Sequence, residues 1–320
     1  MTDPPRELSD DAIGQLIIAL DSLVDGDRAA EQLISYGKKV IPAVERFLVE
    51  SRPRSISMSR CRAVRILGAL GAYSSLLRYF RENITPSDPT VLFAEDTIRS
   101  AAARELIRNE SPATFRVLLD AAKQRPTSGL VQALSQYRWP ESVPLLFALF
   151  EDDLCREDAK DGLRKMPEPA KAYAIRLLRG LTPLPIYGYN ASRRRRATLR
   201  LLVEFGISMN EWPDLRGFLK DEDRDCVIAA ATLGLNFASA AERPTILSAM
   251  LDASAGMNWA QETMAVELLD KWPILGHQVA RKIQAEHSKR GEKPNWLSPF
   301  WRILHHVLGD EMQGQKSGAV

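Results

Sequence analysis

Residues 95–107 read EDTIRSAAARELI, and residues 112–124 read PATFRVLLDAAKQ. In both stretches apolar residues recur every three or four positions, which is typical of an amphipathic α-helix. A polar turn at Asn109 separates them. The second stretch begins with Pro112, a residue favoured in the first turn because its missing N–H costs no helical hydrogen bond there. The two stretches therefore predict a pair of helices joined by a short turn.

The same unit recurs along nearly the whole chain. An apolar helical stretch ends at an anchor residue, and another apolar residue stands seven positions before each anchor. The anchors are 28 to 40 residues apart, a spacing at which stacked repeats share one continuous core. The anchors are Gly37, Gly71, Asn109, Tyr137, Met166, Gly206, Gly234 and Trp272. The residues seven positions upstream are Ala30, Val64, Ala102, Leu130, Ala159, Leu199, Val227 and Ala265.

Three further stretches repeat the pattern of residues 95–107: AAEQLISYGKKVIPAVERFL (29–48), SRCRAVRILGALG (59–71) and DEDRDCVIAAATLG (221–234). Together they resemble the HEAT-repeat family in its short bacterial form, which has an acidic residue, V/I-R, A-A, L-G and then a proline-started second helix. The resemblance spans about residues 27–287, and the fifth and sixth units match it least. It implies an all-α, right-handed α-solenoid of about eight antiparallel helix pairs, and binding far more often than catalysis.

The remaining segments frame this array. Residues 296–308, WLSPFWRILHHVL, predict a capping helix over the open end of the stack. We therefore predict a single α-solenoid domain over residues 11–308. It is preceded by a disordered arm at residues 1–10 and followed by a frayed tail at residues 309–320.

Composition sets limits on compartment and partners. The 320 residues carry 43 Lys or Arg against 41 Asp or Glu, so bulk charge predicts no class of partner. Three widely spaced cysteines form no disulfide framework, which favours a reducing compartment. The first residues, MTDPPRELSDD, do not resemble a signal peptide, and no apolar run approaches the ~18 residues of a membrane span. We predict a cytoplasmic protein that does not bind a membrane.

Signatures of catalysis are missing from the sequence. There is no HExxH, GxSxG, Walker or GxGxxG motif. The four histidines are not spaced with cysteines or carboxylates as metal ligands would be. We predict no catalytic residue, no metal site and no cofactor, and hence a non-enzymatic scaffold or adaptor.

Positive charge gathers in the predicted second helices, which line the concave face of a HEAT stack. These eight stretches hold twelve Lys or Arg and only four Asp or Glu. Such a face attracts an anion, either an acidic protein segment or a phosphate backbone. Alternatively, the long cationic side chains only solvate exposed helix faces. The cations are Arg46, Arg78, Arg81, Arg116, Lys123, Lys171, Arg176, Arg179, Arg216, Lys220, Arg281 and Lys282.

Four arginines, Arg193, Arg194, Arg195 and Arg196, form a run at the start of a predicted helix. At about 100° per residue they surround the helix, and cations at its N-terminus oppose the macrodipole. The run is either an anion site or an exposed charge run whose cost a cap at Ser192 softens. The apolar segment 181–191 before it either projects to bind a partner or covers a gap between units.

Tryptophan precedes proline three times, at Trp139, Trp212 and Trp272, near the turns of alternate units. A row of such rings on one edge could stack bases or hold a partner. The alternative is that each ring covers the end of the core, as a hydrophobic staple does.

Our first hypothesis is a scaffold that binds another protein, with an acidic surface or segment favoured, through its basic concave face. The alternative is a nucleic-acid-binding HEAT-like protein, including the DNA glycosylases of that fold, although no catalytic Trp/Asp/Arg set can be matched here. The candidate partner-binding residues are Arg78, Arg81, Lys171, Arg176, Arg179, Arg193, Arg194, Arg195, Arg196, Arg216, Lys220, Trp139, Trp212 and Trp272.

Overall fold

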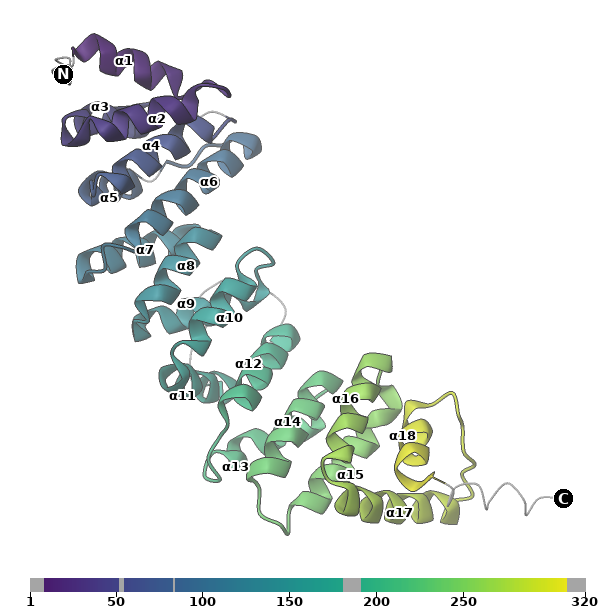
Figure 1. The fold of residues 1–320 in the computed structure, drawn as a ribbon. Helices are drawn as coiled ribbons and strands as arrows, with labels where there is room; N and C mark the ends of the chain where they lie inside the picture. The colour runs from purple at the N-terminus through teal and green to yellow at the C-terminus, as the bar shows by residue number, and fades with distance from the viewer. Residues whose placement is uncertain (1–8, 52–54, 83, 181–190, 310–320) are drawn as a thin grey trace, which may run out of the picture. The chain divides into compact units, whose positions relative to one another are not determined.

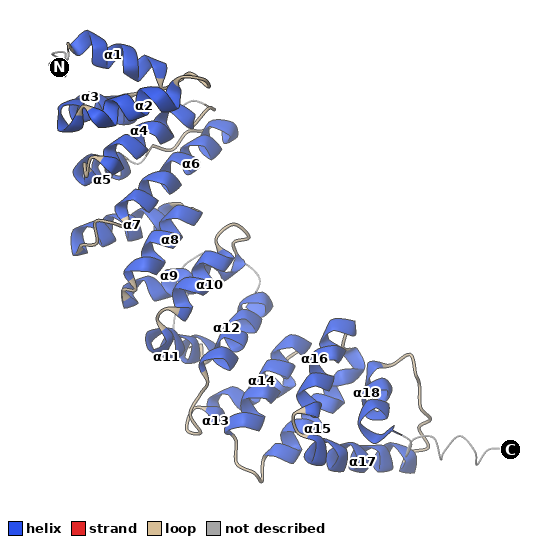
Figure 2. Ribbon diagram, viewed as in Figure 1, coloured by secondary structure: helices blue, strands red, loops and turns tan. Residues whose placement is uncertain are grey.

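The computed structural model describes residues 9–51, 55–82, 84–180 and 191–309. These residues form eighteen α-helices and five short 3-10 helices, and none of them forms a strand (Figures 1 and 2). The prediction of an all-α protein is confirmed. Contacts between residues group the chain into two compact units, Met1–Met166 and Pro167–Val320, which are considered separately below.

The first unit contains ten of these helices. They are α1 (Asp10–Ala19), α2 (Gly26–Ser35), α3 (Ile41–Glu50), α4 (Met58–Ala69), α5 (Tyr73–Arg81), α6 (Pro89–Leu106), α7 (Pro112–Gln124), α8 (Ser128–Tyr137), α9 (Val143–Ala148) and α10 (Arg156–Arg164). The 3-10 helices are η1 (Gly37–Val40), η2 (Pro140–Ser142) and η3 (Leu149–Glu151).

The second unit contains the other eight. They are α11 (Pro167–Leu178), α12 (Ala191–Phe205), α13 (Trp212–Leu215), α14 (Arg224–Phe237), α15 (Arg243–Ala253), α16 (Trp259–Asp270), α17 (Pro273–Lys289) and α18 (Pro299–Leu308). The 3-10 helices are η4 (Arg216–Lys220) and η5 (Ser254–Gly256).

Each unit is built of two rows of helices packed in sequence order (Figure 1). In the first unit, the first row runs α2, α4, α6, α8, α10, and the second row runs α1, α3, α5, α7. In the second unit, the first row runs α12, α14, α16, α18, and the second row runs α11, α13, η4, α15, α17. Consecutive helices also pack across the rows, as α3 on α4 and α14 on α15. The predicted capping helix is present as α18, which packs on α16 and α17.

Helix boundaries follow the expected local chemistry. Pro89 and Pro112 begin α6 and α7, and the side chains of Asp88 and Ser111 cap them by accepting backbone N–H groups. Gly37 adopts φ 69° directly after α2, a left-handed conformation that glycine adopts without strain. These signals are readable in the sequence, which is why the helix pairs could be predicted.

The core lies between the two rows. All eight apolar residues that precede the anchors by seven positions are buried, none exposing more than 1 % of its surface. Leu67 and Leu233, each beside a glycine in a first-row helix, are completely buried. The predicted register of the first-row helices is therefore confirmed.

One anchor is not at a turn. Gly234 lies inside α14, which continues to Phe237. A Cβ atom at this position would come within 2.6 Å of the Trp212 ring and 2.7 Å of Ile246. The glycine is required by this close packing and not by a change of chain direction, so the predicted end of the helix at this position was wrong.

Some predictions concern residues outside the described ranges. The predicted arm falls there except for Ser9 and Asp10, which cap and begin α1. The predicted tail, apart from Gly309, and the apolar segment 181–190 also lie outside them. No helix in the described residues combines the length and apolar character needed to cross a membrane.

Candidate interaction surface

The second-row helices of the first unit bury one face and expose the other. In α3 the buried face includes Val44 and Leu48, and in α5 it includes Leu76 and Phe80. Leu118 occupies the corresponding face of α7. The opposite sides of these three helices are in solvent, and several of the predicted cations lie there.

Three of these cations have no partner in the described part of the chain. Arg46, Arg81 and Arg116 are exposed, and neither a hydrogen bond nor an ion pair joins them to any described residue. Arg78 differs, because its Nη1 lies 2.9 Å from Glu45 Oε1 on the neighbouring helix. The exposed side of α3, α5 and α7, here called the second-helix face, thus keeps unneutralised guanidinium groups.

The second unit shows the same division. Lys171 Nζ lies 3.6 Å from Glu168 Oε2 on α11, and Arg179 pairs with Asp214 on α13. The other predicted cations of α11 and η4 are exposed and form no hydrogen bond or ion pair among the described residues: Arg176, Arg216 and Lys220.

The arginine run, by contrast, is largely engaged within the protein. Arg195 Nε and Nη2 donate to Asp221 at 2.9 and 3.1 Å. Arg196 donates to Asp223 at 2.8 Å and lies 3.0 Å from Asp225. Arg194 is 8 % exposed and Arg193 is half-buried, and both have interaction partners. The run therefore connects α12 to the acidic segment that begins α14.

Hydrogen bonds stabilise the ionised carboxylate of Asp223 in this connection. Partial burial acts to raise the pKa of Asp223, but hydrogen bonds from Ser192 and Arg196 outweigh it and hold the pKa below its usual value. Ser192 lies within α12 and donates to Asp223 at 2.6 Å. It is therefore not the N-cap that the sequence suggested.

The arginines of α4 are likewise paired with carboxylates within the protein. On α4, Arg60 pairs with Glu95, Arg62 with Asp27 and Arg65 with Asp27 and Glu31, each on an adjacent first-row helix. These three arginines of α4 thus join one helix pair to the next. The second-row cations that have no described partner do not join helix pairs through such ion pairs.

The three tryptophans do not form a free row of rings. Trp212 is 2 % exposed and packs against Gly234. Trp139 is half-buried, and its ring centroid lies 4.7 Å from that of Phe115.

The third ring is also engaged. The Arg243 guanidinium carbon lies 4.7 Å from the centre of the Trp272 ring, within the range of a cation–π contact. All three tryptophans are therefore used in packing within the protein.

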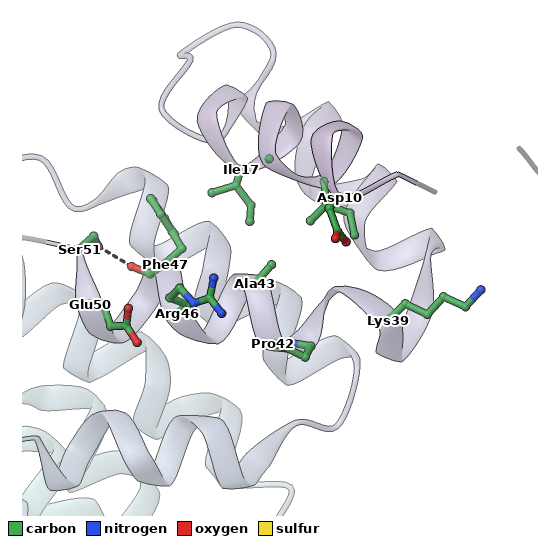
Figure 3. Close-up of a pocket in the computed structure, with 11 residues that line it drawn as sticks. Asp10, Ile17, Lys39, Pro42, Ala43, Arg46, Phe47, Glu50 and Ser51 are labelled. Atoms are coloured by element: carbon green, nitrogen blue, oxygen red, sulfur yellow. Dashed lines mark hydrogen bonds between the residues drawn. The ribbon is translucent and has the colours of Figure 1, made fainter. Parts of the chain in front are cut away.

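Sequence reasoning missed a groove between α1 and α3, shown in Figure 3. It has a volume of about 700 Å³ and is lined by apolar side chains that include Ile17 and Phe47. Arg46, from the second-helix face, lines it as well. The one sequence signal was Gly14, an isolated glycine inside an amphipathic helix.

Two of the three cysteines, Cys155 and Cys226, are buried thiols with raised pKa values. Burial, followed by the charge of Asp221, raises the pKa of the Cys226 thiol to about 12, so it is not a ready nucleophile. Burial likewise raises the pKa of Cys155 to about 12. Within the described ranges no group of histidine, cysteine and carboxylate side chains is arranged to hold a metal ion.

Comparison of this chain with models of known protein families, with curated proteins and with solved structures finds no match.

Proposed function

We propose that this chain is a HEAT-like, right-handed α-solenoid scaffold that binds an acidic segment of a partner protein on the exposed sides of its second-row helices. The proposal builds on two rows of helices in each unit and on the repeated sequence pattern. It assigns the molecule a binding role and no catalytic step.

A single contrast supports the proposal. The arginines of α4, and Arg195 and Arg196 of α12, are paired with carboxylates of a neighbouring helix pair, whereas six of the predicted second-row cations are exposed and pair with no described residue. An exposed, unneutralised guanidinium keeps its full capacity for bidentate bonds to a carboxylate. Such side chains are therefore suited to a partner outside the chain. They are Arg46, Arg81 and Arg116 in the first unit and Arg176, Arg216 and Lys220 in the second.

Two features favour a protein over a nucleic acid as the partner. Acidic side chains lie among the cations, as Glu45 beside Arg78 and Asp214 beside Arg179, and they would repel a continuous phosphate backbone. Trp212 is buried, and the half-buried rings of Trp139 and Trp272 already contact Phe115 and Arg243, which leaves these three rings less free to stack on bases. An acidic peptide with interspersed charges tolerates a mixed surface of this kind.

The test pans a displayed library of random peptides against the full chain and measures the affinity of enriched peptides at two salt concentrations. The same peptides are measured on two double variants with reversed charge. One double variant combines Arg81→Glu with Arg116→Glu, and the other combines Arg176→Glu with Arg216→Glu. Arg28→Glu, at an exposed first-row position, is the matched control. Fluorescence anisotropy with single- and double-stranded DNA and RNA runs in parallel. Melting temperatures verify that each variant is folded.

We expect enriched peptides to be acidic, to bind more weakly at high salt, and to lose affinity for at least one double variant but not for Arg28→Glu. Exposed substitutions of this kind change stability within about ±0.5 kcal/mol, so folding should be preserved. Nucleic-acid binding that disappears in the double variants would favour the alternative partner. Peptide binding that both double variants retain would exclude the exposed cations of α5, α7, α11 and η4 as the site.

A further inference from the structure

Gly14 is exceptional among the glycines of the described α-helices. It lies in the middle of α1, where glycine is less favourable than alanine by ~1 kcal/mol. A Cβ atom there would meet nothing within 4 Å, whereas a Cβ on Gly129 would meet the Ser100 backbone at 2.2 Å. Packing therefore explains Gly129 but not Gly14.

Gly14 lines the groove between α1 and α3, of which Figure 3 labels other residues. The groove is also lined by Pro42 and Ala43 of α3, both short side chains, and by Ile17 and Phe47, which add apolar surface. Small residues on both helices leave room for an outside group to approach the α1 backbone closely, one of the recognised uses of glycine. The side chains of the described residues therefore leave this groove open to a ligand.

The positive charge of Arg46 would make the groove select an acidic ligand. Arg46 reaches into it from α3, and no described residue pairs with the guanidinium group. Lys39 lines the same groove near Asp10, and Glu50 lies at the other end, next to Ser51. Asp10 is in the first turn of α1, where a carboxylate favours the helix dipole. The middle of the groove is thus cationic with apolar walls.

The dimensions fit a short stretch of polypeptide. Pro42, Arg46 and Glu50 are exposed on successive turns of α3, a span of about 12 Å at 1.5 Å per residue. An extended chain covers that distance with roughly four residues. The volume of about 700 Å³ also lies within the range of ligand sites.

We propose that this groove binds a linear segment of a partner protein in which an acidic residue is flanked by apolar ones. The carboxylate pairs with Arg46, and the apolar side chains contact Ile17 and Phe47. The segment's backbone passes over Gly14. The inference rests on the proposed function and adds where the partner docks and which sequence it carries.

The test uses a substitution that fills the groove and changes no core residue. Gly14→Phe places an aromatic side chain in the open space, and Gly14→Ala is the matched control that adds only a methyl group. Arg46→Met removes the charge but keeps an apolar stem. The probes are the peptides enriched on the wild-type chain, measured against all three full-length variants, with melting temperatures as a check on folding.

We expect peptides with an acidic residue between apolar ones to lose at least about tenfold in affinity on Gly14→Phe and to keep it on Gly14→Ala. Arg46→Met should weaken binding about fivefold at low salt and less at high salt, as for an exposed ion pair. Melting temperatures of both Gly14 variants should match or exceed that of the wild type, because glycine is the weaker helix former.

The outcomes separate this inference from the proposed function. Peptides that still bind Gly14→Phe, but not Arg81→Glu with Arg116→Glu, would overturn the groove and leave the scaffold role in place. Equal loss on Gly14→Ala and Gly14→Phe would also overturn it, because a methyl group does not fill the space. If no acidic peptide is enriched, both proposals fail.

Discussion

Removing the buried carboxylate of Glu95 should destabilise the first unit strongly. Glu95 is 1 % exposed; it accepts a hydrogen bond from Arg60 Nη1 at 2.5 Å and another from the Tyr79 hydroxyl. Glu95→Ala would leave both donors without this acceptor in the interior. Arg60 would keep its bonds of 2.8 and 3.1 Å to the Leu48 carbonyl oxygen.

The magnitude follows from these contacts. Breaking a buried ion pair by removing one partner costs about 3–5 kcal/mol, and a buried hydroxyl left unsatisfied costs ~1–3 kcal/mol. The two bonds that Arg60 retains reduce the first contribution. We therefore expect Glu95→Ala to lower the free energy of unfolding by about 3–4 kcal/mol at pH 7.

The assay is urea denaturation of the full chain followed by circular dichroism. Because two compact units can unfold in separate steps, the affected transition is assigned with a second variant of the first unit, such as Leu67→Ala. Glu82→Ala is the control, since its exposed carboxylate lies 3.8 Å from Arg78 and should contribute less than about 0.5 kcal/mol. A loss below about 1 kcal/mol for Glu95→Ala would refute the argument that this pair is a critical part of the core.

Three further predictions can be tested in the same way. Leu67→Ala or Leu233→Ala should each cost about 2–4 kcal/mol in urea denaturation, as buried leucine truncations do, and a loss below about 0.5 kcal/mol would contradict the assigned core. Gly234→Ala should lower the melting temperature despite alanine's better helix propensity, because its Cβ would come within 2.6 Å of Trp212; a higher melting temperature would contradict this packing. The pKa of Asp223 is below its usual 3.8, so its stabilisation is present above about pH 3.8 and is lost as the pH falls towards the folded value. Asp223→Asn should therefore lower the melting temperature more at pH 7 than at a pH below 3.8, and its effect should shrink as the pH is lowered further; an effect that does not change with pH would contradict an ionic role.

Local chemistry made most of the helix pairs predictable. Proline starts such as Pro112 and turn glycines such as Gly37 act within a few residues, so they can be recognised without knowledge of the fold. The prediction that a helix ends at Gly234 was wrong because the role of this glycine depends on Trp212, which is distant in sequence. Periodicity cannot distinguish a glycine that ends a helix from one that admits a neighbouring ring.

The acidic partners of the arginine run were not predicted, for a related reason. Local rules consider only a helix terminus with four cations, whereas the neutralising acids follow one repeat later. Arg196 and Asp223 are 27 residues apart, close to the 28 residues between the anchors Gly206 and Gly234. Aligning charges at the repeat spacing would have revealed these pairs, because equivalent positions of adjacent repeats lie side by side.

The groove between α1 and α3 could not be predicted as a cavity, because its volume depends on how far apart two helices pack. Sequence supplies only Gly14 as an unexplained glycine, and Arg46 as one cation among many. The candidate surface of exposed cations was predictable from the charges in the second helices. The sequence could not predict which of these cations remain unpaired, because the possible partners of such a cation include residues of a neighbouring repeat.

The sequential packing of helices also bears on how the chain folds. The hydrogen bond from Arg62 to the Leu20 carbonyl joins residues 42 positions apart, about one repeat, in a chain of 320. Contacts of such short range correspond to a low relative contact order, which is associated with fast folding. Each helix pair can meet its partners soon after it leaves the ribosome, before most of the following sequence has been made. During synthesis from the N-terminus, each new helix pair should therefore pack on the helix pairs that have already folded.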